Sequence, residues 1–310
     1  MKKKLICLLL MSAFSSVLSA QVTTSAAPDE DGVVWKKVET PHFTAYYEKN
    51  WAPSGLVLEL ERIHSTLNMN MSSFAGWISG GKITLYIYKN ESSYLKSHFK
   101  PMKWARAIAL VGGAPTIVLY DYPDRKEFTE VVAHESTHLI LGDYFKDAPG
   151  ALPLWLNEGM AIFNEDSTAG LGQGAWSASL KYKGADGFMP TEKFVETEVN
   201  ADTSSTTVQM WYLQAYATVQ FLYRPDKKMQ FKVFMLSVKE GMPFRDAVWK
   251  AYRYSSLREL DNDFKAWVKT SSRAAKDTGF GFSGSGFVPF ETGYSRFNNR
   301  EFTRPAENGQ

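Results

Sequence analysis

Apolar residues repeat along the chain with two different periods, and the first of them predicts β-strands in the N-terminal third. Four segments either alternate apolar with polar residues or are rich in β-branched and aromatic residues, which is typical of strands. These segments cover residues 35–48, 82–88, 105–111 and 116–120. Pro41 interrupts the first of them, so this segment is expected to form one or two strands.

The second period, in which apolar residues recur every three or four positions, predicts helices. It starts at residues 56–71 and dominates the chain after residue 125. The predicted helices cover residues 56–71, 91–99, 126–141, 154–163, 209–223, 229–238, 243–252 and 256–269. The chain is therefore expected to have an α+β fold, with a small N-terminal mixed sheet and a mostly helical C-terminal half.

The first 20 residues have the pattern of a secretory signal peptide. A basic start at Lys2–Lys4 precedes the apolar run Leu5–Met11, and small residues follow up to Ala20. The run is too short to span a bilayer stably, so no membrane span is expected after cleavage. Cleavage would remove the only cysteine and change the net charge from +2 to about −1. An exported bacterial protein, periplasmic or secreted, is expected.

Composition suggests where the folded domain begins and ends. Residues 21–32 are polar and predict a linker, and residues 33–272 carry the periodic pattern of a single domain. From 273 to 310 the chain is rich in Gly, Phe and polar residues, which predicts a tail. A Gly- and Ser-containing stretch at 165–190 predicts a long surface loop, expected near the candidate metal site described below. The chain has no Lys/Arg cluster of the kind that binds nucleic acid.

The most informative motif lies in the predicted helix 126–141. His134 and His138 are four residues apart, so they lie one turn above the other on the same face. With Glu135 they form the pattern His-Glu-x-x-His, in which two imidazoles bind zinc and the glutamate takes a proton from water. Glu135 is also expected beside the apolar side of the helix, where an unpartnered carboxylate is costly unless it has a catalytic use.

Glu158 is the candidate for a third zinc ligand. It follows His138 by 20 positions, and Leu156 and Met160 flank it within an apolar helix. A carboxylate in these surroundings needs a cation nearby to offset its burial. Two histidines and a glutamate would leave one position of a tetrahedral zinc site open. The alternative is that the short His-Glu-x-x-His pattern arose by chance.

The two motifs together resemble those of a known family. Val132–His138 (VAHESTH) followed by Trp155–Ala161 (WLNEGMA) is similar to the gluzincin metallopeptidases, and most similar to exported peptidase-MA-like proteins. The resemblance covers residues 35–269. It implies a zincin-like fold, with the sheet packed on the motif helix, zinc bound by His134, His138 and Glu158, and Glu135 as the general base. A peptide or protein substrate is implied as well.

Departures from related patterns narrow this resemblance. Metzincins need Gly and His where this chain has Leu141 and Tyr144, and thermolysin-like enzymes need Asp where it has Ile162. Thermolysin-like enzymes also use a downstream histidine, but no histidine follows His138. The stretch Gly113–Thr116 lacks the acid with which aminopeptidase-like enzymes hold a free amine, so strict aminopeptidase activity is not expected.

A residue that stabilises the oxyanion must then come from elsewhere, and tyrosine is the usual substitute in the aminopeptidase-like gluzincins. Tyr212 and Tyr216 lie one turn apart on the apolar helix 209–223, and Tyr216 is the preferred candidate. The alternative is that both side chains only pack. Of the remaining histidines, His42 could be a ligand but is expected to have a structural hydrogen bond, and His64 is also expected to be structural.

Two other functions remain open at this stage. The protein could bind zinc without cleaving peptides and serve as a binding or scaffold module of the envelope, although a structural site has no need of Glu135. It could also be a latent enzyme whose cleft is blocked by the tail or by residues 165–190. The sequence does not indicate an oligomeric state.

Overall fold

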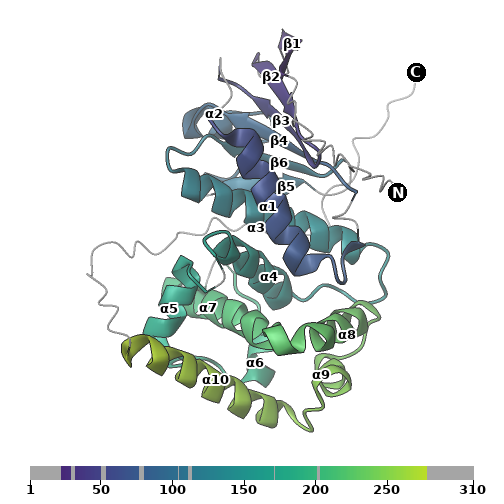
Figure 1. Ribbon diagram of the computed structural model, residues 1–310, viewed down its shortest axis with the longest axis vertical. Helices are drawn as coiled ribbons and strands as arrows, with labels where there is room; N and C mark the ends of the chain where they lie inside the picture. Colours follow the sequence, from purple (N-terminus) through teal and green to yellow (C-terminus); the bar gives the residue numbers. More distant parts are fainter. Residues whose placement is uncertain are drawn as a thin grey trace, which may run out of the picture.

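The computed structural model describes eight stretches of the chain. These are residues 22–28, 32–49, 54–76, 80–103, 105–110, 114–170, 172–200 and 203–277. The predicted signal peptide and residues 278–310 of the predicted tail lie outside the described residues. Within the described part, an N-terminal sheet covered by helices is followed by a helical region (Figure 1).

The sheet is mixed, as predicted, and has six strands in the order β1-β2-β3-β4-β6-β5. Its strands are β1 (Val22–Pro28), β2 (Val34–Glu39), β3 (Phe43–Tyr47), β4 (Ile83–Tyr88), β5 (Ala107–Leu110) and β6 (Thr116–Tyr120). Strand β4 lies at its centre and runs parallel to both β3 and β6. The other neighbouring pairs are antiparallel.

One prediction about this part of the chain was wrong. Residues 21–32 were expected to be a linker, but residues 22–28 form β1, whose Val22 and Thr23 pair with Val38 and Lys37 of β2. Strand β6, which leads toward α3, is an inner strand of the sheet, because it lies between β4 and β5. The strand at this edge of the sheet is β5, which pairs antiparallel with β6.

The two faces of the sheet are covered differently. On one face, buried residues such as Ala45 and Leu85 pack against α1 (Leu56–Met71) and α3 (Arg125–Tyr144), forming the main core with the helical region. On the other face, Trp35 and Tyr88 pack with Tyr94 of the short helix α2 (Glu91–Leu95). Helix α3, which carries the His-Glu-x-x-His motif, is therefore packed on the sheet.

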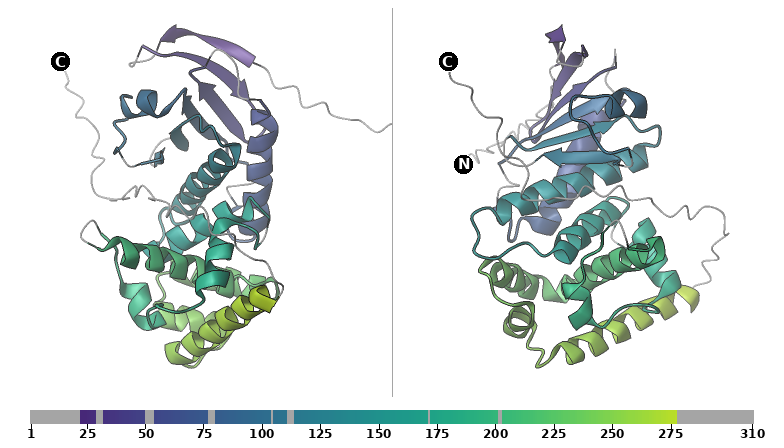
Figure 2. Two further views of the ribbon diagram at one scale, coloured as in Figure 1. Left: turned by 90° about the vertical axis from the view of Figure 1, so that its left-hand side faces the viewer. Right: turned by 180° about the vertical axis from the view of Figure 1, so that it is seen from behind.

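The rest of the described chain is helical, and in Figure 2 it lies below the sheet and α3. Its helices are α4 (Leu154–Ser167), α5 (Ala175–Lys183), α6 (Thr191–Glu196), α7 (Ser205–Leu222), α8 (Lys228–Lys239), α9 (Phe244–Tyr252) and α10 (Leu257–Asp277). A 3₁₀ turn, Pro225–Lys227, precedes α8. The predicted α+β zincin-like fold is confirmed.

The helical region also corrects two predicted boundaries. Residues 165–190 are not a long loop, because α4 continues to Ser167 and α5 begins at Ala175. Asp166 organises this turn by accepting hydrogen bonds from the backbone N–H groups of Trp176 (2.9 Å) and Ser177 (3.2 Å). The domain boundary predicted at residue 272 falls inside α10, which continues to Asp277.

None of the described helices combines enough length with enough apolar character to cross a bilayer.

Candidate metal centre

Helix α3 is held in place at its start and near its middle. Asp124 caps its start by accepting a hydrogen bond from the backbone N–H of Lys126 at 2.8 Å. Near its middle, Thr137 accepts a hydrogen bond from Asn164 of α4 at 3.0 Å, and Asn164 in turn accepts one from Asn70 of α1 at 2.9 Å. All three side chains in this hydrogen-bond network are buried. The network fixes α3 and α4 against α1, and therefore fixes the two motifs relative to each other.

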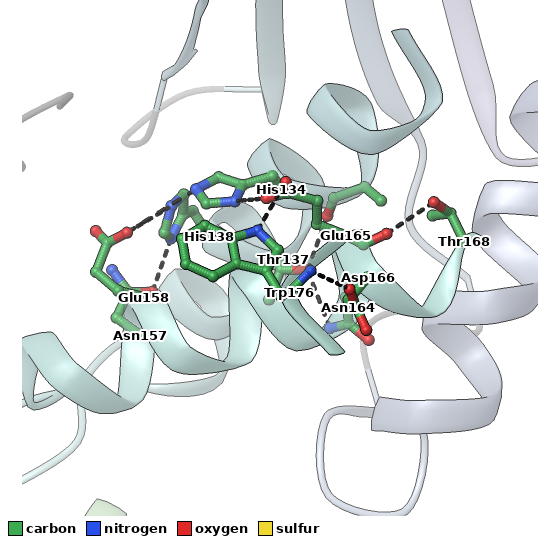
Figure 3. Close-up of polar contacts among 11 residues, drawn as sticks. His134, Thr137, His138, Asn157, Glu158, Asn164, Glu165, Asp166, Thr168 and Trp176 are labelled. Carbon is green, nitrogen blue, oxygen red and sulfur yellow. Dashed lines mark hydrogen bonds and ion pairs between the residues drawn. The ribbon is translucent and has the colours of Figure 1, made fainter. Parts of the chain in front are cut away.

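The candidate ligand atoms of the two motifs converge (Figure 3). Glu158 Oε2 lies 3.9 Å from His134 Nε2 and 4.0 Å from His138 Nε2. These distances are too long for hydrogen bonds. They approach the separation of about 3.4 Å that two ligands of a tetrahedral zinc ion adopt when each bond is about 2.0–2.1 Å long. All three ligand atoms lie within 4.8 Å of one another.

The other ring nitrogens of the two histidines are already bonded. Glu165 Oε2 lies 2.9 Å from His134 Nδ1, and Asn157 Oδ1 lies 2.9 Å from His138 Nδ1. Since a carboxylate and an amide oxygen accept hydrogen bonds, both Nδ1 atoms carry the hydrogen, and the Nε2 atoms are left to bind a metal. Trp176 Nε1 donates to the second oxygen of Glu165 at 3.2 Å and holds that carboxylate in place.

Replacing Glu165 with Ala is expected to weaken zinc binding by about 10- to 100-fold, because His134 would lose the acceptor that orients its ring. The affinity can be measured by competition with a chelator of known strength. Glu192→Ala is a suitable control, since Glu192 is an exposed residue of α6. Equal affinities of wild type and Glu165→Ala would show that Glu165 does not support the metal site.

The charges of the site are unbalanced without a cation. Burial raises the pKa of Glu158 to about 7. Burial alone would lower the pKa of His134, but the hydrogen bond to Glu165 and the surrounding carboxylates raise it to about 9. Burial and the charge of His134 lower the pKa of His138 to about 4. One proton on His134 therefore balances part of the buried negative charge, and a divalent cation would replace it.

Glu135 lies beside these ligands and has a free acceptor. Its side chain is buried, and Oε2 has no hydrogen-bond partner among the described residues. Burial raises its pKa, and the two histidines oppose this rise. An acceptor of this kind next to a metal site is suited to take a proton from water.

The preferred oxyanion residue has a different environment from the one expected. The Tyr216 hydroxyl is buried, donates to Asp166 Oδ2 at 2.9 Å and lies 2.6 Å from Ser177 Oγ. These bonds connect α7 to the turn between α4 and α5, which is a structural role. These hydrogen bonds favour the alternative that Tyr216 is structural, and its role as an oxyanion residue stays a prediction. Tyr212 is also buried and packs edge-on against Trp211.

The sequence reasoning missed Glu165 and Asn157, although the sequence contains a signal for both. Glu165 follows Glu158 by seven residues, which is two helical turns and places both on one face of α4. Asn157 immediately precedes Glu158. The structure brings His134, Glu135, His138 and Glu158 together as predicted, and it adds these two partners behind the histidines.

Comparison with known proteins agrees with the geometry. The family model described as the Peptidase MA superfamily matches residues 69–270, which include both motifs and most of the helical region. No curated protein matches the chain in sequence.

Proposed function

The chain belongs to the Peptidase MA superfamily, and from this premise we propose that it is a zinc-dependent peptidase that uses Glu135 as its general base. The observation that carries the proposal is the convergence of His134 Nε2, His138 Nε2 and Glu158 Oε2 from two helices, next to the unpartnered Oε2 of Glu135. A purely structural metal site would have no use for this fourth group, Glu135.

The residues present suit zinc. Two imidazole nitrogens and one carboxylate oxygen are its usual ligands in catalytic sites, where a fourth position stays open to water. The ion would also neutralise Glu158, whose burial without a cation is costly. His134, His138 and Glu158 would therefore hold the metal, and Glu165 and Asn157 would orient the rings.

The proposed mechanism uses few groups of the chain. Zinc at this site would polarise a peptide carbonyl and lower the pKa of water to about 7. Glu135 accepts a proton from the water that attacks the carbonyl carbon. Glu135 then donates this proton to the amine that leaves when the C–N bond breaks. The buried position of Glu135 suits this exchange, because its raised pKa lets it both accept and return the proton.

Strand β5 offers a place for an extended peptide. It is one of the two edge strands of the described sheet and contacts α3, which carries the motif. Its outer side is not paired with any strand in the described part of the chain. A peptide that pairs with this edge would run beside the metal centre, and its backbone would supply most of the contacts. We therefore propose a peptide or unfolded protein segment as the substrate.

The test combines metal analysis with hydrolysis. Compared with the wild type, His138→Ala should contain about one zinc less per chain and should not cleave a generic unfolded protein. A chelator should stop wild-type cleavage, and zinc should restore it. If His138→Ala keeps the same zinc content, the metal site proposed here is wrong. If the wild type contains the zinc but cleaves nothing, the alternative of a non-catalytic or latent zinc protein is favoured.

A truncated chain would distinguish a latent enzyme, blocked by its tail, from a zinc protein that does not cleave peptides. Because α10 continues to Asp277, the truncation should follow Asp277, so that no described helix is cut. Cleavage by the truncated chain alone would indicate that the tail blocks the site. The proposed exported location depends on the predicted signal peptide, residues 1–20, and can be tested by fractionating cells that express the full chain.

A further inference from the structure

A second cluster of metal-binding side chains lies away from the α3 motif, where helix α1 meets the sheet. Glu61 and His64 are on α1, three residues apart and therefore on the same face. His42 lies on the connection between β2 and β3, immediately before Phe43. One ligand atom of each of these three residues lies within 4.8 Å of the other two.

The three side chains hold one another in place. The backbone N–H of His42 donates to Glu61 Oε1 at 3.2 Å, and His42 Nδ1 lies 2.7 Å from Glu61 Oε2. The rings of His42 and His64 are stacked, with centroids 3.4 Å apart and an angle of 6° between their planes. The bond to Glu61 agrees with the structural role predicted for His42, and the stacked His64 adds a third possible ligand.

We propose that His42, Glu61 and His64 form a second binding site for a divalent cation of the zinc type. Two imidazoles and a carboxylate are the donor set that zinc prefers. Glu61 and His64 form a Glu-x-x-His pair, a spacing with which one helix can offer two ligands to the same ion. The third ligand, His42, comes from a different segment of the chain, so the ion would connect two elements.

The spacing of the rings suits an ion after a small adjustment. Stacked rings place their edges about as far apart as two ligands of one zinc ion, for which about 3.4 Å is expected. Tilting the rings about their χ2 bonds would turn the two nitrogens toward a common point, and such terminal torsions are soft. The side chains of His42 and Glu61 are 28% and 19% exposed, so an ion from solution can reach them and keep water ligands.

This site would stabilise the fold rather than take part in hydrolysis. Helix α1 is bonded to α3 through Glu59, which accepts hydrogen bonds from Arg125 and from Thr129 (2.8 Å). It is bonded to α4 through Asn70. An ion at His42, Glu61 and His64 would tie this helix to the sheet as well. Its occupancy is therefore expected to raise the thermal midpoint, because a ligand that binds only the folded state stabilises that state.

The experiment counts zinc in the full mature chain. At saturating zinc, after unbound metal is removed, the wild type should contain two zinc ions per chain. His64→Ala should contain one and should keep the wild-type rate of peptide hydrolysis. His98→Ala is the matched control, because His98 is an exposed histidine outside both clusters. It should keep both ions.

Other variants keep the test informative if His64→Ala does not fold. Glu61→Gln preserves the size of the side chain and should also lose one ion, together with part of the rise in melting temperature caused by zinc. His138→Ala should lose the other ion and retain the one at His42, Glu61 and His64. The proposal is overturned if the wild type holds a single zinc that His138→Ala removes, or if two zinc ions remain in both His64→Ala and Glu61→Gln. Either result leaves the peptidase proposal to be judged on its own test.

Discussion

Replacing Glu135 with Gln is expected to lower kcat for peptide hydrolysis by about 10²- to 10⁴-fold while leaving the zinc content unchanged. Glutamine has nearly the same shape but cannot accept a proton from water at neutral pH. The proposed zinc ligands His134, His138 and Glu158 should remain in place, since Glu135 Oε2 has no hydrogen-bond partner among the described residues. Initial rates on an unfolded protein substrate and metal analysis of the same samples measure the two quantities.

The stability of this variant helps to interpret the loss of rate. Glu135 is a buried carboxylate with one unpartnered oxygen, so a neutral amide at this position is not expected to lower the free energy of unfolding. A loss of rate without a loss of stability would separate the chemical role of Glu135 from any role in folding. Glu192→Gln, on the surface of α6, controls for the substitution itself. Wild-type turnover by Glu135→Gln would rule out Glu135 as the general base.

The sequence predicted local features of the fold better than its long-range pairing. The bounds of α1 were predicted at Leu56–Met71, because every third or fourth residue of this segment is apolar. The position of β6 inside the sheet was not predicted, because periodicity does not show which strands become neighbours. The short helix α5 was missed as well, since glycines at 170, 172 and 174 surround the turn that leads into it.

The same contrast applies to the candidate site. Glu158 could be predicted because a carboxylate between apolar residues of one helix needs a cation or another partner. Tyr216 could not be assigned, because an aromatic residue on an apolar helix has the same sequence signature whether it packs or catalyses. Its actual partner, Asp166, is 50 residues away in the chain, so only the tertiary structure connects the two.

Gly159, the residue after Glu158, lets α4 and α7 pack closely together, so a larger residue at this position is expected to destabilise the fold. A Cβ atom at this position would lie 2.6 Å from the carbonyl oxygen of Ala215 and 2.8 Å from Val219 Cγ2. In an exposed helix, changing Gly to Ala stabilises by about 1 kcal/mol. Here the change should instead lower the free energy of unfolding by about 2–3 kcal/mol, because a backbone oxygen of α7 cannot rotate away. Denaturant unfolding of the zinc-free protein measures this difference.

Gly76 provides the matched control for Gly159→Ala. A Cβ atom at Gly76 meets nothing within 4 Å, and the residue does not have a positive φ angle, so Gly76→Ala should change stability by less than about 0.5 kcal/mol. Gly159→Ala should in addition weaken zinc binding, because α4 can relieve the clash only by moving away from α7, and this movement displaces Glu158. Unchanged stability of Gly159→Ala would mean that α4 and α7 are not packed as closely as the structure shows. Reduced stability with full zinc affinity would mean that the position of Glu158 does not depend on this helix contact.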